Sequence, residues 1–271
     1  MPAPITCEIA DDVAFVTLNR PEKRNALSLE ALTGLIDTGR RLRGDRSVRA
    51  VLLAGNGPAF CAGIDTSVLA GGRGEFLRSF LPRPVRGTNV FQEAVWTWRR
   101  LPVPVVAAVH GHCFGAGLQL ALAADFRFST PDAGWSIMES KWGLVPDMAG
   151  VHALSQQVGL DVAKRLTMTG EIVSGERAYR LGLVTEVADD PRAAAGALID
   201  QILLRSPDAI AAAKRLFESS WHRGPRATLA RERWAQWPLL TAANTRIARK
   251  VAIEKAAPEY RPRGGAGLAR R

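Results

Sequence analysis

The hydrophobic positions of this chain predict a sheet whose strands alternate with helices. Strand-like segments contain repeated β-branched residues, either alternating with polar residues or in short continuous runs. These segments are 5–9, 13–18, 49–54, 103–109 and 125–129. The first two are expected to pair across a turn at Asp11 and Asp12. The segment 49–54, which is apolar after Arg49, and the apolar run 103–109 are typical of strands that are buried on both faces.

Helical patterns occupy most of the remaining chain. After Ser28, a residue type that caps helices, apolar residues recur on one face up to Gly44. Thr88 is expected to cap another helix. Further helical patterns cover 151–158, 161–168, 174–181, 191–204, 207–219 and 227–255. Because strand-like sequence nearly disappears toward the C-terminus, we expect an α/β core over residues 1–200 and a helical region over 201–271.

The C-terminal helical region carries more apolar surface than a small helical appendage can bury by itself. Its large apolar residues include Trp221, Trp234 and Trp237. Large exposed apolar patches usually mark contacts with other molecules, and most oligomers are built from identical copies. We therefore expect this region to join copies of the chain, and packing of these helices on a core of their own is the alternative.

A glycine-rich stretch follows the apolar run 103–109 and precedes a helical pattern. Gly111, Gly115 and Gly117 allow the backbone to turn sharply and to be approached closely. The predicted result is a strand, a tight turn and the N-terminus of a helix. Amides in the first turn of a helix have no intrahelical acceptor, and the helix dipole is positive there. Such a turn binds negative charge.

Two nucleotide-binding motifs also contain glycine clusters, but neither matches this stretch. A dinucleotide fingerprint requires a glycine three residues after Gly117, where this chain has Leu120. A P-loop requires Gly-Lys-Ser/Thr, which the sequence does not contain. The remaining interpretation is an oxyanion site, in which backbone amides stabilise an oxygen that becomes negative during a reaction.

Composition and charge narrow the function classes. The chain has 271 residues, 47% of them hydrophobic, which is ordinary for a globular protein. No apolar run reaches the roughly 18 to 20 residues of a membrane span, and the start lacks a secretory pattern, so we expect a cytoplasmic protein. The net charge is +10, but the basic clusters are short and have no interleaved aromatic residues. A small phosphorylated ligand therefore fits this charge better than nucleic acid.

A second segment of small residues, 59–65, suits close approach of a ligand to the backbone. Cys61 lies inside it, either as a nucleophile or, as we expect from its apolar neighbours, as a buried structural thiol. The three cysteines show no metal-ligand spacing and are expected to be reduced. The next segment, 66–87, is long and irregular, which is typical of a lid or a pocket wall.

Two carboxylates, Glu139 and Asp147, lie among tryptophan, methionine and valine residues. Apolar surroundings raise the pKa of a carboxyl group toward neutral pH, which suits a group that transfers protons. The alternative is that Glu139 forms an ion pair with Lys141 or with an arginine at the surface.

Taken together, four motifs resemble the crotonase superfamily, the enoyl-CoA hydratase/isomerase family, over almost the entire chain. They are 19–27, 59–65, 109–119 and the pair 138–139 with Gly143 and Pro146. The resemblance implies an α/β spiral of repeated ββα units with a C-terminal helical trimerisation region, assembled as a homotrimer or a dimer of trimers. It implies an acyl-CoA thioester as the substrate, with no cofactor apart from the coenzyme A of that substrate.

The resemblance also assigns roles to individual residues. The amides of Ile64 and Ala116 match the two oxyanion donors that polarise the thioester carbonyl. Six residues lie in segments that resemble those holding the phosphates and adenine of the coenzyme: Lys23, Arg24, Ala26, Leu27, Ala62 and Asp65. A metal site is not expected, because His110 and His112 have no third ligand in view.

The catalytic positions depart from the hydratase pattern. Hydratases of this family carry glutamates at the positions of Gln119 and Glu139, whereas the glutamine here cannot accept a proton. Asp147 lies where dienoyl-CoA isomerases of the family carry a catalytic aspartate. We therefore expect Glu139, assisted by Asp147, to move a proton in a double-bond isomerisation. The alternatives are a hydratase in which Gln119 positions water, a non-catalytic acyl-CoA carrier, and an RNA-binding relative that charge alone suggests.

Overall fold

The computed structural model describes residues 2–70, 78–83 and 87–264, and its main feature is a mostly parallel sheet. The strand order is β1-β2-β3-β4-β6-β8. These strands are β1 (Ile5–Ala10), β2 (Val13–Leu18), β3 (Ala50–Gly55), β4 (Val105–Val109), β6 (Phe126–Ser129) and β8 (Glu186–Val187). Only β1 and β2 pair antiparallel, across the expected turn at Asp11 and Asp12, where both residues have positive φ. All the other neighbours pair parallel.

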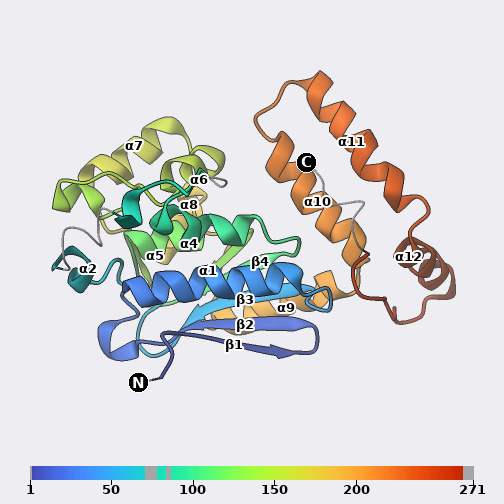
Figure 1. Ribbon diagram of the computed structural model, residues 1–271, viewed down its shortest axis with the longest axis horizontal. Coiled ribbons are helices and arrows are strands. Elements are labelled where there is room, and N and C mark those ends of the chain that lie inside the picture. The colour runs from blue at the N-terminus through green and yellow to red at the C-terminus, as the bar shows by residue number, and fades with distance from the viewer. Residues whose placement is uncertain (1, 71–77, 84–86, 265–271) are drawn as a thin grey trace.

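Both faces of the central strands are buried, as the continuous apolar runs predict. In β3, Val51 and Leu53 belong to a core shared with α1 (Leu29–Gly44), α4 (Val90–Arg99) and α5 (Ala116–Leu122). Leu52 points to the opposite face and joins a second core with Ile199 of α9 (Pro191–Leu203). Figure 1 shows α1 and α9 on opposite sides of the sheet. The helices therefore cover the sheet as in other parallel α/β architectures.

A second, smaller layer of strand pairs lies between the main sheet and the helices that follow each strand. Here β5 (His112–Phe114) pairs parallel with β7 (Gly134–Ser136). Isolated bridges join Leu27 to Ile64, Cys61 to Cys113 and Trp135 to Val173. The chain thus repeatedly runs from a main strand to a short pairing segment and then to a helix, which confirms the expected spiral of ββα units. The sequence predicted a turn where β5 lies, because three residues are too few to show a period.

Of the two predicted helix caps, one was confirmed and one was wrong. The Ser28 hydroxyl accepts a hydrogen bond from the Ala31 amide at 3.2 Å and caps α1, as expected. The cap of α4 is Asn89 and not Thr88, whose hydroxyl instead donates to the buried Glu93 carboxylate. Asn89 accepts from the Gln92 amide, and the Gln92 side chain accepts from Asn89 in return.

The helical pattern 227–255 forms two helices, α11 (Pro225–Leu239) and α12 (Ala243–Glu254). Pro238 lies one residue before the end of α11, and it removes one backbone donor from the last turn. The expected irregular segment 66–87 begins as a short helix, α2 (Thr66–Ala70), and much of the remainder lies outside the described residues.

The remaining elements complete the molecule. They are η1 (Pro21–Lys23), η2 (Glu139–Trp142), α6 (Gly150–Gln157), α7 (Leu160–Thr169), α8 (Gly175–Leu181) and α10 (Pro207–Ser220). Figure 1 shows α10, α11 and α12 projecting to one side of the sheet as an arm, with α6, α7 and α8 above the opposite end. In the part of the chain that the structure describes, no helix is long and apolar enough to cross a membrane.

The arm is held to the spiral by buried charge and leaves its large apolar residues outside. The Lys214 ammonium of α10 lies 2.7 Å from the Asp125 carboxylate and 2.9 Å from the Val103 carbonyl oxygen, and its side chain is only 6% exposed. By contrast, Trp234 and Trp237 of α11 are 78% and 73% exposed. The alternative was that these tryptophans pack on a core within the arm. In a single copy of the chain they do not.

We expect Lys214→Ala to destabilise the protein by about 3 to 5 kcal/mol, because it leaves the Asp125 carboxylate without its cation. The measurement is the urea unfolding midpoint at one fixed protein concentration. Lys250→Ala is the matched control, because Lys250 lies 3.9 Å from Glu254 and both side chains are exposed. The control should cost less than about 1 kcal/mol, and equal losses in the two variants would contradict the prediction.

Candidate active site

Two turns that are far apart in the sequence adjoin one another in the second layer. The Cys61 amide donates to the His112 carbonyl oxygen at 2.8 Å, and the Phe114 amide donates to the Cys61 carbonyl oxygen at 3.0 Å. Three residues beyond each cysteine of this bridge lie Ile64 and Ala116. A Cβ atom built on Gly63 would lie 4.0 Å from the Ala116 amide nitrogen, so the two turns are in direct contact.

Both of the predicted oxyanion amides lack a hydrogen-bond partner among the residues that the structure describes. Ala116 is the first residue of α5, so its N–H group precedes the hydrogen-bond ladder of that helix. At the other turn, the bridge to Leu27 uses the Gly63 carbonyl and the Asp65 amide and leaves the Ile64 amide out. Within the described ranges, neither the Ile64 nor the Ala116 N–H group has a hydrogen-bond acceptor in the protein. The adjoining turns therefore present two N–H groups from which a ligand oxygen can accept hydrogen bonds.

Gly115 brings the carboxylate of Glu139 to the same turn. Its φ of 50° is in the left-handed region, and a Cβ atom there would lie 3.4 Å from Glu139 Oε1. Glycine therefore satisfies both the backbone conformation and the close approach of the carboxylate. As a result, Glu139 lies beside the residue that precedes Ala116, although the two are distant in sequence.

Three hydrogen bonds to neighbouring residues hold the Gln119 side chain. Its Oε1 atom accepts from the Met148 amide at 2.8 Å and from the Gly150 amide at 3.0 Å. Its Nε2 atom donates to Glu139 Oε1 at 2.6 Å. A Cβ atom at Gly150 would lie 2.5 Å from Gln119 Oε1, so only glycine allows this contact. The two backbone donors determine the orientation of the amide, and its nitrogen must therefore face Glu139.

Sequence reasoning missed Met148 and Gly150. Both act through backbone N–H groups, which every non-proline residue has, and the side chains therefore carry no signal of the contact. Only the glycine at position 150 marks the place, and glycine has many other uses.

The electrostatics suit proton transfer at Glu139. Burial raises the pKa of this carboxyl group, its own backbone amide and the Gln119 amide lower it, and the charge of Asp147 raises it further. Burial also raises the pKa of Asp147. Glu139 Oε2 is buried and has no hydrogen-bond partner among the described residues. The alternative ion pair with Lys141 does not form, and the contact of Glu139 is with Gln119 instead.

The segments predicted to hold the coenzyme lie side by side. The Ala62 amide donates to the Arg24 carbonyl oxygen at 2.9 Å, and Leu27 forms a bridge with Ile64. Lys23 and Arg24 are exposed at the end of η1, so their charges face solvent. Residues 23–27 therefore run along the strand that leads to Ile64.

The side chain of Asp65 is occupied within the protein. Its carboxylate accepts from the Ser67 amide at 2.9 Å and from Arg20 Nη1 at 2.8 Å, and Arg20 also donates to the Ala26 carbonyl oxygen. The pKa of Asp65 is lowered to about 2, first by the Ser67 backbone hydrogen bond and, despite burial, also by Arg20. Arg20 was not singled out from the sequence, because an arginine in a polar loop is unremarkable by itself.

The thiols at the bridge are inert. Cys61 and Cys113 are completely buried, and burial raises the pKa of Cys61 to about 12. A thiol that remains protonated is a poor nucleophile, so the expectation of a structural thiol at Cys61 is confirmed. The two nearby histidines contact different groups. His110 Nε2 is 2.8 Å from the Gly57 carbonyl oxygen, and the His112 ring lies 4.8 Å from the ring of Phe114.

Comparisons with known proteins agree with the motifs. The family model described as enoyl-CoA hydratase/isomerase matches residues 8–262. A probable enoyl-CoA hydratase of Mycobacterium tuberculosis is 38% identical over 192 residues, which cover 71% of this chain and 72% of the relative. A probable enoyl-CoA hydratase of Rhodobacter capsulatus is 34% identical over 263 residues, 94% of this chain and 97% of the relative.

A solved structure shows the same fold. The crystal structure of an enoyl-CoA hydratase from Polaromonas sp. JS666 has a TM-score of 0.85 and 30% identity to this protein. The match covers 95% of this chain and 99% of that structure. The chain therefore belongs to the enoyl-CoA hydratase/isomerase family, the crotonase superfamily that its motifs resemble.

Proposed function

We propose that this enzyme moves a double bond within an enoyl-CoA thioester through an enolate, with Glu139 as the acid/base group. The thioester carbonyl oxygen accepts hydrogen bonds from the Ile64 and Ala116 amides. These two donors are unpaired and lie on adjoining turns, which supports the assignment. The coenzyme lies along residues 23–27 and 62–65, where Lys23 and Arg24 supply positive charge for its phosphates.

The proposed reaction relocates one proton. Glu139 Oε2 removes a proton from the carbon next to the thioester carbonyl, and the electron pair moves into an enolate whose oxygen is held by the two amides. The double bond shifts as the same proton returns at the far carbon of the allylic system. Asp147 assists, because its charge raises the pKa of Glu139 and so favours the protonated intermediate. The net change needs no water and no oxidant.

The state of Gln119 is the single observation that favours isomerisation over hydration. Both lone-pair positions of its oxygen are used by the Met148 and Gly150 amides, and its nitrogen donates to Glu139. It therefore has no acceptor left for a proton of an attacking water. Hydration by two carboxylates requires a second proton-accepting group beside the water, and an amide at position 119 cannot be that group.

Hydration is the alternative, because relatives are named enoyl-CoA hydratases and the second N–H of Gln119 can donate to a water oxygen. A non-catalytic acyl-CoA carrier is a further alternative. It is disfavoured by the buried Glu139 Oε2, which has no structural partner in the described part of the chain.

We propose that the arm joins three copies, as a homotrimer or a dimer of trimers. Trp234 and Trp237 of α11 and Ile253 of α12 are each more than 70% exposed in one copy. Burying such side chains against a neighbour stabilises each by roughly 1.5 to 3 kcal/mol.

We expect Glu139→Gln to lower kcat on a 3-enoyl-CoA by about 10² to 10⁴-fold, because the amide cannot accept the proton. Acyl-CoA affinity should change little, since the carbonyl and coenzyme contacts lie on other residues. Steady-state kinetics and equilibrium binding of a non-reactive acyl-CoA measure the two effects.

Glu186→Gln is the control for this variant, because Glu186 is exposed on β8 at the edge of the sheet. It should retain the activity of the parent protein. If Glu139→Gln leaves the turnover of crotonyl-, 3-enoyl- and dienoyl-CoA unchanged, the carrier alternative is correct.

We expect Gln119→Glu to increase hydration of crotonyl-CoA, because it places a second carboxylate beside Glu139. It should also raise the pKa of Glu139, since a hydrogen-bond donor is replaced by a like charge. Glu139 must be ionised to remove a proton, so isomerase kcat/KM rises with pH through this pKa, and that limb should move to higher pH.

Gln119→Met is the matched variant, because it removes the same donor without adding a proton acceptor. It should move the pH limb upward but bring no gain in hydration. If the parent protein hydrates crotonyl-CoA as fast as it isomerises a 3-enoyl-CoA, Gln119 supports hydration without substitution. That result would reject the preference for isomerisation.

We expect light scattering to give the mass of three or six chains. Trp234→Glu with Trp237→Glu should shift the protein toward single chains, because two charges would be buried at the interface. A single chain of the parent protein at micromolar concentration would refute the assembly.

A further inference from the structure

The Ile64 amide lies beyond the point where its segment is paired on both sides. On one side, the pairing with β5 ends at the Cys61 amide and carbonyl groups, and the Gly115 amide donates to the Ser136 carbonyl oxygen instead. On the other side, the pairing continues as far as the bridge between Leu27 and Ile64. In the described part of the chain, the backbone at Ile64 is therefore held against another segment through the Leu27 bridge.

The Leu27 bridge also sets the direction of the Ile64 amide. The Leu27 amide donates to the Gly63 carbonyl oxygen at 2.8 Å, and the Asp65 amide donates to the Leu27 carbonyl oxygen at 3.0 Å. Because successive N–H groups of a paired segment point to opposite sides, the N–H group of Ile64 points away from Leu27. That is the side on which the turn of Ala116 adjoins. A loose bridge would therefore let the Ile64 donor turn away from the oxyanion site.

Arg20 ties together the two segments that form this bridge. Its Nη1 atom donates to the Ala26 carbonyl oxygen at 2.6 Å and to Asp65 Oδ2 at 2.8 Å. Ala26 precedes Leu27, and Asp65 follows Ile64, so one nitrogen atom bonds both segments beside the bridge. A terminal guanidinium nitrogen carries two hydrogens, which supply one donor for each of these acceptors.

The backbone that carries Arg20 is itself fixed by Asn25. Asn25 is buried, with a φ of 57°, and its Oδ1 atom accepts from the Arg20 amide at 2.8 Å. Its Nδ2 atom donates to the carbonyl oxygens of Asn56 and Ala59 at 2.9 and 2.7 Å. Arg20 is thus attached to the turn that leads into the oxyanion segment, and its guanidinium group reaches the bridge from a fixed position.

The contact between Arg20 and Asp65 persists over the working pH range. The two side chains are 23% and 12% exposed, so solvent reaches them only in part. The pKa of Asp65 is about 2, lowered first by the Ser67 amide and also by Arg20. Its carboxylate therefore remains an acceptor at every pH at which Glu139 can exchange a proton. Hydrogen bonds between charged groups are about twice as strong as neutral ones.

We propose that Arg20 is a positioning residue for the oxyanion site: through Ala26 and Asp65 it keeps the Ile64 N–H group directed at the thioester oxygen. This role rests on the proposed function, in which the Ile64 and Ala116 amides bind that oxygen. A displacement of about 1 Å in such a site can lower the rate about 100-fold. A purely structural ion pair would change stability but not the polarisation of a bound thioester.

The test is the absorption spectrum of 2,4-hexadienoyl-CoA bound to the full-length protein in saturating excess. Hydrogen bonds to the thioester oxygen draw electron density from the conjugated chain and move its absorption to longer wavelength. The Glu139→Gln background prevents turnover, and we expect a red shift on binding there. Adding Arg20→Met should reduce this shift by about half or more. Arg20→Lys should keep most of the shift, because an ammonium group can also donate to both acceptors.

Kinetics separate this role from support of the coenzyme. In the protein that retains Glu139, Arg20→Met should lower kcat on a 3-enoyl-CoA about 10- to 100-fold. The dissociation constant of coenzyme A alone should change less than about threefold, because Lys23 and Arg24 remain. Arg40→Met is the matched control, since Arg40 lies 3.4 Å from Asp37 in an exposed ion pair on α1, and it should match the parent in both measurements.

Asp65→Asn gives a second measurement and decides the outcome if Arg20→Met does not fold. Its side-chain oxygen can still accept from the Ser67 amide, whereas its nitrogen cannot accept from Arg20. It should lose the same part of the red shift as Arg20→Met. The double variant should lose no more, because both residues act through one contact.

The possible failures point to different errors. A full red shift in both Arg20→Met and Asp65→Asn would overturn the positioning role and leave the oxyanion assignment in place. The absence of any red shift in Glu139→Gln itself would overturn the assignment of the Ile64 and Ala116 amides, and the role of Arg20 with it. Equal losses of kcat and of coenzyme A affinity in Arg20→Met would show that Arg20 supports the coenzyme segment alone, which also rejects the proposal.

Discussion

The hydrogen bonds between the Cys61 and Cys113 segments are the constraint on which the candidate site depends. They hold the segment that leads to Ile64 against β5, which leads to Ala116, so the two amides cannot move apart without breaking this pairing. A Cβ atom at Gly117 would lie 2.6 Å from the Cys61 Cβ atom, so α5 is packed directly on this bridge. An oxyanion site gains from such rigidity, because its donors need no reorganisation when charge develops.

Under the proposed function, the amide at position 119 confines Glu139 to the transfer of a single proton. As an amide, Gln119 supplies a donor to one carboxylate oxygen and leaves the other buried and unpaired. As a carboxylate, it would share a proton with Glu139 and could also accept one from water. The Met148 and Gly150 amides act only as hydrogen-bond donors. They can hold the side chain at position 119 in place whether it is an amide or a carboxylate.

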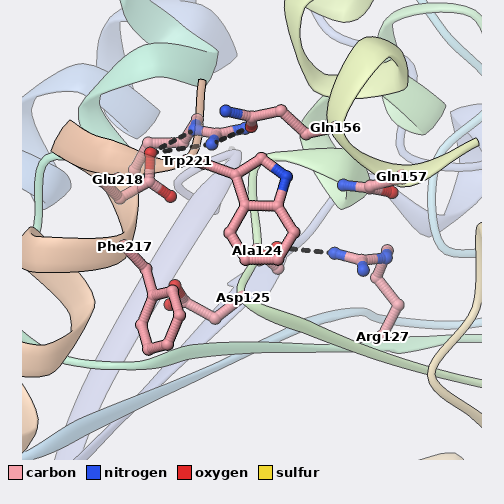
Figure 2. Close-up of a pocket in the computed structure, with 9 residues that line it drawn as sticks. Ala124, Asp125, Arg127, Gln156, Gln157, Phe217, Glu218 and Trp221 are labelled. Atoms are coloured by element: carbon pink, nitrogen blue, oxygen red, sulfur yellow. Dashed lines mark hydrogen bonds and ion pairs between the residues drawn. The ribbon is translucent and has the colours of Figure 1, made fainter. Parts of the chain in front are cut away.

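Two ion pairs join the arm to the spiral. Lys214 with Asp125 and Arg99 with Glu218 cross the seam. A pocket of about 220 Å³ is lined by members of both pairs, and Figure 2 shows Asp125 and Glu218 around it. Ion pairs with little exposure require exact geometry, since each charge would be costly if its partner moved. They orient α10 and leave the tryptophans of α11 facing away from the spiral, where they are available to other copies of the chain.

The sequence by itself determined the five longest strands, the first helix cap and the order of the four motifs, because these depend on local periodicity and residue type. It also led to Ile64, Ala116, Gln119 and Glu139 through the resemblance of those motifs to a known family. Tertiary structure alone decided that Asn89 caps α4, that β5 exists, and that Gln119 faces Glu139 with two amides behind it. It also placed Arg20 between Ala26 and Asp65. These outcomes depend on backbone donors and on distances between segments far apart in the chain. The type of a side chain predicts neither of them.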